Sequence, residues 1–284
     1  MRPHTTRTWL IAVSLLAAVA ISATSAESGS AKTGRRSITV AVVQFNAIPE
    51  AVDQNLAAME RLARAAVKLG AHWVVFHEAS NCDYTDKLSA LAEPVPCGRS
   101  TIRMSALAKE LGCFLSFGLS ERDGDRFYIT QVFVGPEGFV HRYRKTWLHK
   151  EPLDGGFRNE YARYDPGTGP EPFEIDGVRA TCFICSDSTS PRCIARARDL
   201  RPDVVFFPVN IVTHHPKDLQ TTTATHARTI GAPLLSANRV GDSWSNRGGQ
   251  GGAAIYSATG EVLARAKSDG QEEIVLHRLE VPVR

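Results

Sequence analysis

Apolar strand patterns alternate with amphipathic helix patterns along most of this chain. Runs of β-favouring apolar residues predict buried strands, and apolar residues at helical spacing predict the helices. The predicted strands are Ile38–Phe45, Trp73–Phe76, Phe114–Ser120, Phe127–Val134, Phe139–Arg144, Val178–Ile184, Val204–Val209, Leu234–Asn238, Ala253–Tyr256, Glu261–Ala266 and Ile274–Leu279. The predicted helices are Asp53–Leu69, Thr101–Leu111, Cys193–Leu200 and Asp218–Ile230. This order predicts a single α/β domain with a mixed sheet system.

Two stretches interrupt the pattern. Asn81–Gly98 contains Pro94 and Pro96, which predicts a loop with at most a short helix. Lys150–Gly169 is rich in glycine, acidic and aromatic residues, which predicts a long surface loop. Long loops in compact domains usually carry function.

The first 26 residues have the pattern of a secretory signal peptide. Arg2 and Arg7 precede an apolar run, Trp9–Ile21, and Thr24 and Ala26 suit the −3 and −1 positions of a cleavage site. The apolar run is short for a membrane span, although an uncleaved anchor is the alternative. The predicted organisation is a signal peptide (1–26), a polar linker (27–37) and one catalytic domain (38–284).

The signal-peptide pattern predicts that the protein is exported and is periplasmic or secreted. After cleavage, we expect no stable insertion into a membrane. The protein's compartment would be oxidising, so some of the six cysteines could pair. Cys82 and Cys97 flank a loop and are the first expected bridge, while a catalytic Cys185 would have to stay reduced. The formal net charge of +3 falls to +1 without Arg2 and Arg7, which gives no electrostatic case for binding nucleic acid.

Three reactive side chains each lie just after the end of a predicted strand. Glu78, Lys145 and Cys185 each follow a predicted strand, so we expect them to meet at one sheet edge. A nearby ammonium favours the thiolate, and a carboxylate within reach can take the thiol proton. The lysine and the backbone N–H after Cys185 can hold a developing oxyanion. Together these groups predict acyl transfer through a thioester.

Several motifs in fixed order resemble one family. They are AVVQFN, NLAAMERLARAAVKLGAHWVVFHE, HRYRKTWL, FICSD, SANRVG and GGAAIYSATGEVLA. From about Ile38 to about Leu279, the chain resembles the carbon–nitrogen hydrolase family, also called the nitrilase superfamily.

The resemblance implies a fold, a site and a reaction. The fold is a four-layer α-β-β-α sandwich of the nitrilase/amidase type that usually forms homodimers or larger homo-oligomers. Glu78 would be the general base, Lys145 the lysine and Cys185 the nucleophile, with Glu160 as a supporting glutamate that orients Lys145. The reaction would be hydrolysis of a small-molecule amide or nitrile, with no metal or organic cofactor.

The chain departs from the family pattern beside these residues. The family's common proline before the glutamate is absent in Phe76-His77-Glu78, and Ser188–Pro191 and His226–Ile230 replace two other motifs. No Trp-Glu pair follows Cys185, as it does in true nitrilases. We therefore expect an amidase that acts on a non-peptide bond of a small amide or N-carbamoyl compound.

Three rival hypotheses remain open. A nitrilase would attack a C≡N carbon with the same triad, and a non-catalytic binding protein would retain only the fold. A redox protein would use the C-x-x-C pair Cys182 and Cys185, although residues three apart on a strand point to opposite faces. His214-His215 is weak metal-ligand evidence, so we predict no metal site.

The substrate-binding residues are predicted from their positions. Asn210 stands at a strand end beside the expected cleft, and Ser186 directly follows the nucleophile. Tyr84 and Trp147 are expected to shape the pocket.

Overall fold

The fold contains two six-stranded mixed sheets. A computed structural model describes residues 34–150, 159–212, 216–243, 248–268 and 270–282, which belong to one unit, Thr33–Arg284. The order in the first sheet is β12 (Glu273–Pro282), β1 (Arg35–Gln44), β2 (Trp73–Val75), β3 (Phe114–Asp123), β4 (Arg126–Gly135) and β5 (Gly138–Arg144). The order in the second is β11 (Val262–Arg265), β10 (Ala254–Tyr256), β9 (Leu234–Ala237), β8 (Val204–Pro208), β7 (Val178–Cys182) and β6 (Phe173–Ile175).

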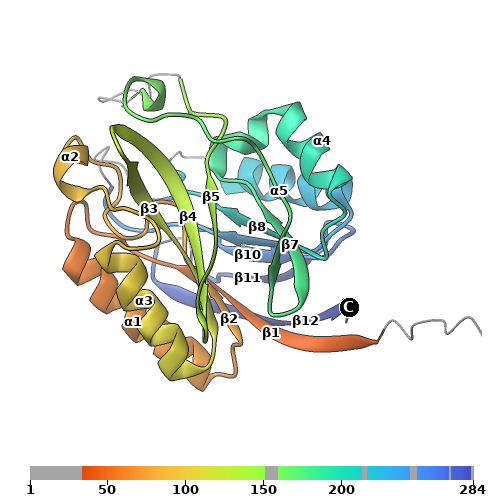
Figure 1. Ribbon diagram of the computed structural model, residues 1–284. Coiled ribbons are helices and arrows are strands. Elements are labelled where there is room, and N and C mark those ends of the chain that lie inside the picture. Colours follow the sequence, from red (N-terminus) through yellow and green to blue (C-terminus); the bar gives the residue numbers. More distant parts are fainter. Residues whose placement is uncertain (1–33, 151–158, 213–215, 244–247, 269, 283–284) are drawn as a thin grey trace, which may run out of the picture. The chain divides into compact units, whose positions relative to one another are not determined.

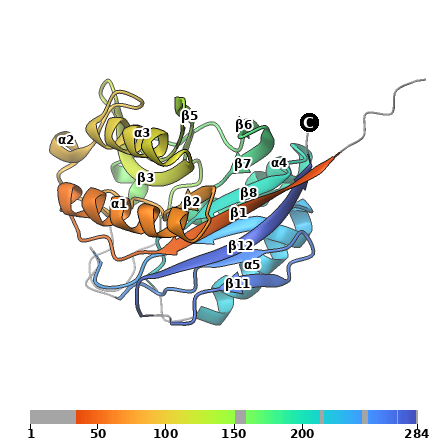
Figure 2. The same cartoon turned by 90° about the horizontal axis from the view of Figure 1, so that it is seen from below.

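Helices cover the outer face of each sheet. α1 (Val52–Lys68) and α3 (Arg99–Leu111) pack on the first sheet, and α4 (Pro191–Asp199) and α5 (Pro216–Ile230) pack on the second (Figures 1 and 2). α2 (Leu88–Leu91) is a single short turn. The layers are therefore α-β-β-α, and the predicted sandwich is confirmed. Within the described residues, no helix has the length and apolar character needed to cross a bilayer.

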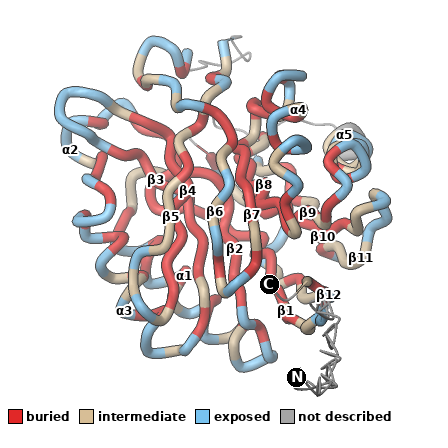
Figure 3. The backbone as a smooth tube through the Cα atoms, turned by 45° about the vertical axis from the view of Figure 1, so that its right-hand side comes forward, coloured by how far each residue is buried: buried red, intermediate tan, exposed pale blue. Residues whose placement is uncertain are grey.

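The inner faces of the two sheets pack against each other. The ring of Phe206 on β8 lies 5.8 Å from that of Trp73 on β2 and 5.0 Å from that of Phe133 on β4. Figure 3 shows the strands as the buried centre of the fold, with most exposed residues in loops and on outer helix faces. Burial of apolar surface on both sides of each sheet explains why the strand sequences are continuously hydrophobic.

Strand direction places three reactive segments near one another. β2 and β3 are parallel, and two antiparallel pairings bring β5 back to the same direction, so β2 and β5 end on the same side of the sheet. In the second sheet, β7 and β8 are parallel and also end together. Glu78 follows β2, Lys145 follows β5 and Cys185 follows β7.

Three sequence expectations differ from the structure. β1 begins at Arg35, inside the stretch expected to be a linker, because Arg35–Ser37 extend the ladder with β12. The three-residue strand β6 is too short to give a period-2 signal and was not predicted. The expected bridge between Cys82 and Cys97 is wrong: all six cysteines are free, Cys82 is buried and Cys97 is exposed.

Gly118 on β3 packs directly against the main chain of the turn that follows β2. A Cβ at Gly118 would lie 2.2 Å from the nitrogen of Ala79, so this strand has room only for glycine. We expect Gly118→Ala to lower the free energy of unfolding by about 1–3 kcal/mol, because overpacking forces the backbone to move. Urea denaturation measures the change. Gly270→Ala is the matched control, since Gly270 is exposed and has no atom within 4 Å of such a Cβ. Equal stability of the two variants would contradict the prediction.

Candidate active site

The thiol of Cys185 stands on a strained turn after β7. Its φ angle of 44° lies in the left-handed region that non-glycine residues rarely adopt, and it opens the short helix η2 (Cys185–Thr189). The main-chain N–H of Asn210 acts on this thiol and lowers its pKa, which places the sulfur near the residue that follows β8. The turn therefore directs the sulfur toward the end of β8.

The buried carboxylate of Asp187 holds this turn in place. Its Oδ2 accepts hydrogen bonds from the N–H of Ile184 and the hydroxyl of Tyr143, both at 2.8 Å. Its Oδ1 accepts from the N–H groups of Thr146 and Trp147 at 3.0 and 2.6 Å. Asp187 thus ties the cysteine turn to the residues that follow Lys145. Asp187 was not predicted as a site residue, although an acid two positions after Cys185 was a usable signal in the sequence.

The carboxylate of Glu78 is buried three residues beyond the end of β2. Its Oε1 accepts hydrogen bonds from Lys145 Nζ and from the Tyr84 hydroxyl, both at 2.7 Å. Its Oε2 has no hydrogen-bond partner among the described residues. One oxygen is therefore held by donors, while the other has unused accepting capacity.

The ammonium of Lys145 lies between two carboxylates. Nζ is 2.7 Å from Glu78 Oε1 and 2.9 Å from Glu160 Oε1, and Lys145 is 1% exposed. Glu160 belongs to the short helix η1 (Glu160–Ala162), and its Oε2 accepts from the N–H of His149 at 2.7 Å. Tyr84 also donates toward Glu160, at 2.9 Å. Glu160 thus contacts Lys145 directly and is itself held by the main chain at His149.

Burial and neighbouring charges shift the pKa values of Lys145, Glu78 and Cys185. Burial opposes the charge on Lys145, but Glu160 and Glu78 outweigh it and hold the pKa of the ammonium well above its usual value. Burial raises the pKa of Glu78, and Glu160 adds to this, while Lys145 opposes it. Burial and the Glu78 charge raise the pKa of the Cys185 thiol. The thiol therefore stays protonated at neutral pH until a base takes its proton.

The prediction that the three residues meet at one sheet edge is wrong in one respect. Glu78 and Lys145 follow strands of the first sheet, whereas Cys185 follows a strand of the second. They meet across the facing sheets, because the inner faces pack together and the strands β2, β5 and β7 end toward the same region. Sequence patterns mark strand ends without showing which sheet holds each strand.

The predicted substrate-binding residues have different environments. Tyr84 is buried against Glu78 and Glu160, and Asn210 is buried beside Cys185. Ser186 is buried and donates to the carbonyl oxygen of Trp147 at 2.6 Å. The side chain of Trp147 is 46% exposed, and its main chain contacts the site.

The histidine beside the base is neutral. Burial, and then the charge of Arg239, lower the pKa of His77 to about 3. Its Nδ1 lies 2.7 Å from the carbonyl oxygen of Glu78, and its ring packs on Phe45. This agrees with the expectation that His77 is a structural neighbour of the base.

The alternative redox and metal sites receive no support from the described residues. Cys182 and Cys185 are both free thiols, and burial raises the pKa of Cys182 well above its usual value. No group of three or more His, Cys, Asp or Glu residues in the described ranges is arranged to hold a metal ion. His214 and His215 lie outside the described residues.

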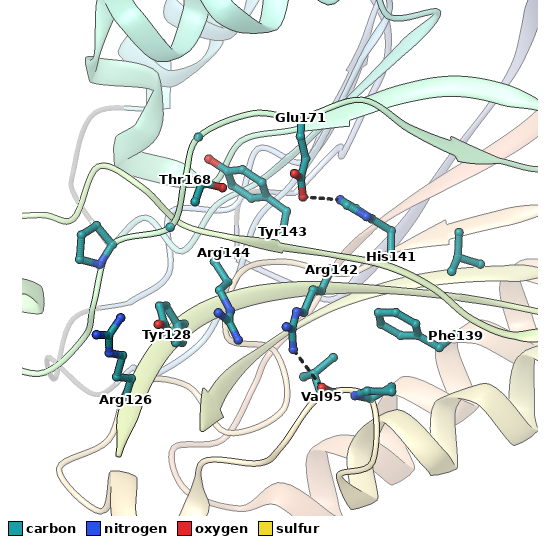
Figure 4. A pocket seen from close by; sticks show the side chains of 15 residues that line it. Val95, Arg126, Tyr128, Phe139, His141, Arg142, Tyr143, Arg144, Thr168 and Glu171 are labelled. Atoms are coloured by element: carbon teal, nitrogen blue, oxygen red, sulfur yellow. Dashed lines mark hydrogen bonds and ion pairs between the residues drawn. The ribbon is translucent and has the colours of Figure 1, made fainter. Parts of the chain in front are cut away.

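A pocket of about 690 Å³ lies along the outer edge of β5, away from these groups (Figure 4). None of Glu78, Lys145 and Cys185 lines it. Two of its three arginines are already engaged: Arg142 and Arg144 both pair with the buried carboxylate of Glu121, and Arg144 stacks over the ring of Tyr128 at 3.8 Å.

Comparison with known proteins identifies the family. Residues 39–282 match the family model described as carbon-nitrogen hydrolase. The chain belongs to this family. A nitrilase of Pyrococcus abyssi is 30% identical over 84% of this chain and 87% of its own length. An N-carbamoylputrescine amidase of Solanum lycopersicum is 29% identical over 87% of each chain.

A solved structure supports the fold of this carbon–nitrogen hydrolase. An amidase from Nesterenkonia sp. superposes with a TM-score of 0.75 at 19% identity, covering 85% of this chain and 90% of that one. Family membership makes the protein an enzyme that hydrolyses non-peptide carbon–nitrogen bonds.

The hydroxyl of Tyr84 contributes to the pKa of Glu78. It donates to Glu78 Oε1 and thereby lowers the pKa of a carboxyl that burial raises. Activity that needs ionised Glu78 is lost as pH falls through this raised pKa, above the ordinary 4.5. We expect Tyr84→Phe to move the acidic limb of the kcat/KM profile to higher pH, because one stabilising donor is gone. Tyr161→Phe, at an exposed position, is the control. A limb that stays in place in Tyr84→Phe would argue against this coupling.

Proposed function

We propose that the enzyme is an amidase that hydrolyses a small amide or N-carbamoyl compound through a thioester on Cys185. The observation that carries the proposal is the placement of Lys145 Nζ between Glu78 and Glu160, beside a thiol on a strained turn. This set contains a base, a cation and a nucleophile, which are the groups that thiol acyl transfer requires.

The first half of the reaction forms the thioester. Glu78 takes the proton of Cys185, and the sulfur attacks the acyl carbon. The ammonium of Lys145 stabilises the oxyanion that develops on the carbonyl oxygen. The C–N bond then breaks, and the nitrogen leaves with the proton that Glu78 returns.

The second half releases the acid. Glu78 removes a proton from water, the resulting nucleophile attacks the thioester carbon, and the C–S bond breaks. The thiolate regains its proton from Glu78, so the site returns to its starting state. Glu160 keeps Lys145 oriented throughout.

A nitrilase activity is the second candidate. It uses the same triad, and the relative from Pyrococcus abyssi carries that name. The missing Trp-Glu pair after Cys185 and the amidase named from Solanum lycopersicum favour the amidase.

Ammonia release tests the reaction and the substrate class together. The panel contains short and aromatic amides, N-carbamoyl compounds and nitriles. We expect release from an amide or N-carbamoyl compound, and its loss in Cys185→Ala, because no other group replaces the sulfur as nucleophile. Cys113→Ala is the matched control, because Cys113 is a buried cysteine that directly precedes β3 and is not part of the triad.

Two results would overturn this proposal. Release only from nitriles would make the enzyme a nitrilase. Wild-type protein that is silent on the whole panel, with Cys185 unreactive toward iodoacetamide, would favour the binding-protein hypothesis.

We also propose that the protein is exported and forms a homodimer or larger homo-oligomer. Arg2, Arg7 and the apolar run before Ala26 support export through a cleaved signal peptide. The resemblance to a family that assembles through helices near the cysteine supports an oligomer, and we expect α4 and α5 to form this contact.

The N-terminus of the mature chain tests export. We expect protein recovered from outside the cytoplasm to begin at Glu27, because Ala26 suits the −1 position of the cleavage site. Mass spectrometry of the intact chain measures this, and Ala26→Arg should retain residues 1–26. A wild-type chain that begins at Met1 and stays in the cytoplasm would refute the proposal.

A further inference from the structure

The side-chain oxygen of Asn210 is a buried acceptor in the active site. Asn210 is 7% exposed, and its Oδ1 has no hydrogen-bond partner among the described residues. Nδ2 of the same residue lies 3.4 Å from the carbonyl oxygen of Glu78, and its main-chain N–H lowers the pKa of the Cys185 thiol. The oxygen therefore belongs to a residue that lies beside both Glu78 and Cys185.

Asp83 fixes which end of the amide is the oxygen. Asp83 Oδ1 accepts a hydrogen bond from Asn210 Nδ2 at 2.8 Å. A carboxylate only accepts hydrogen bonds, so the nitrogen must face it and Oδ1 must face away. The orientation of Asn210 follows from the charge of its neighbour.

Asp83 is itself held by a buried ion pair with Arg239. The guanidinium of Arg239 pairs with Asp83 Oδ2, and both side chains are 0% exposed. Arg239 is itself held by a donated hydrogen bond to the carbonyl oxygen of Ala47 at 3.1 Å. A buried ion pair of this kind permits little movement, so Arg239, Asp83 and Asn210 form a rigid series that ends at the nucleophile.

The triad does not use the Asn210 oxygen. The free oxygen of Glu78, Oε2, is available to take the thiol proton, and Lys145 supplies charge for the oxyanion. An acceptor that remains buried and unpartnered is costly unless a ligand supplies a donor. In an amide substrate, the donor at the reacting centre is the N–H of the scissile nitrogen.

We propose that Asn210 Oδ1 accepts a hydrogen bond from the N–H of the scissile nitrogen, and that Asp83, paired with Arg239, is the residue that positions it. This inference rests on the proposed function. It makes Asn210 a specificity-determining residue for substrates with the group –C(=O)–NH₂, which primary amides and N-carbamoyl compounds share.

The contact also assists departure of the nitrogen. When Cys185 forms the C–S bond, the C–N bond breaks and the proton from Glu78 moves to nitrogen, so ammonia leaves. The hydrogen bond from one N–H to Asn210 Oδ1 restricts rotation of the –NH₂ group. The lone pair of the nitrogen then stays in position to receive the proton from Glu78. An ester and a nitrile present no N–H, so neither gains from Asn210 on binding.

The amide-to-ester ratio tests this role. Wild type and Asn210→Ala are compared on the primary amide that wild type cleaves best and on the methyl ester of the same acid. We expect the ratio of kcat/KM for amide over ester to fall about 10–100-fold in Asn210→Ala, the range of one lost hydrogen bond. Ester turnover in the same sample shows that the variant is folded.

Two further variants distinguish a loss of Asn210 orientation from a general disturbance of the fold. Asp83→Asn should also lower the ratio, because a carboxamide at 83 no longer fixes the orientation of Asn210. Asn55→Ala removes a buried asparagine of α1 that hydrogen bonds to Ile48 and Asn81, and should leave the ratio unchanged.

The outcomes distinguish the two levels of proposal. Amide and ester rates that fall together in Asn210→Ala would overturn the role of Asn210 and leave the amidase intact. An unchanged ratio in Asp83→Asn would overturn the role of Asp83. A wild-type enzyme that cleaves neither substrate class would overturn the amidase proposal itself, and this inference with it.

Discussion

The buried ammonium of Lys145 is the interaction on which the rest of the site depends. Taking one charge out of water is costly, and this lysine is fully buried. Two carboxylates, Glu78 and Glu160, offset that cost and keep the ammonium charged. Removing one partner from such a buried pair costs about 3–5 kcal/mol, because the remaining charge is left without compensation. The position of the Lys145 ammonium and its positive charge are therefore both set by Glu78 and Glu160.

The two-sheet architecture makes that cluster possible. Each sheet is buried on both faces, so its strands end at fixed positions, and the aromatic contact between Trp73 and Phe206 holds the sheets together. The base and lysine come from one sheet and the nucleophile from the other. Asp187 then joins the two sides through hydrogen bonds on both of its oxygens. Rigid packing of this kind restricts a catalytic thiol more closely than a surface loop would.

Sequence patterns predicted most of the strands and helices and the proximity of Glu78 to Lys145, but not the buried residues that hold them in place. Long apolar runs such as Val204–Val209 give a strong strand signal, and a glycine, Gly112, ends α3 in the left-handed conformation. The ion pair of Asp83 with Arg239 joins residues far apart in the chain, and no local pattern marks it. The expected bridge from Cys82 was wrong for a related reason, because spacing along a loop does not show that its thiol is buried and its supposed partner exposed.

Buried polar groups in this enzyme fall into two kinds. Those of Asp83, Asp187 and Glu160 are satisfied by protein donors, and they fix the geometry of other residues. Glu78 Oε2 and Asn210 Oδ1 have no partner among the described residues. Both acceptors belong to residues that influence the Cys185 sulfur, one through its charge and the other through its N–H. Since native structures rarely leave buried acceptors unpaired, their clustering at the nucleophile favours a substrate that supplies donors there.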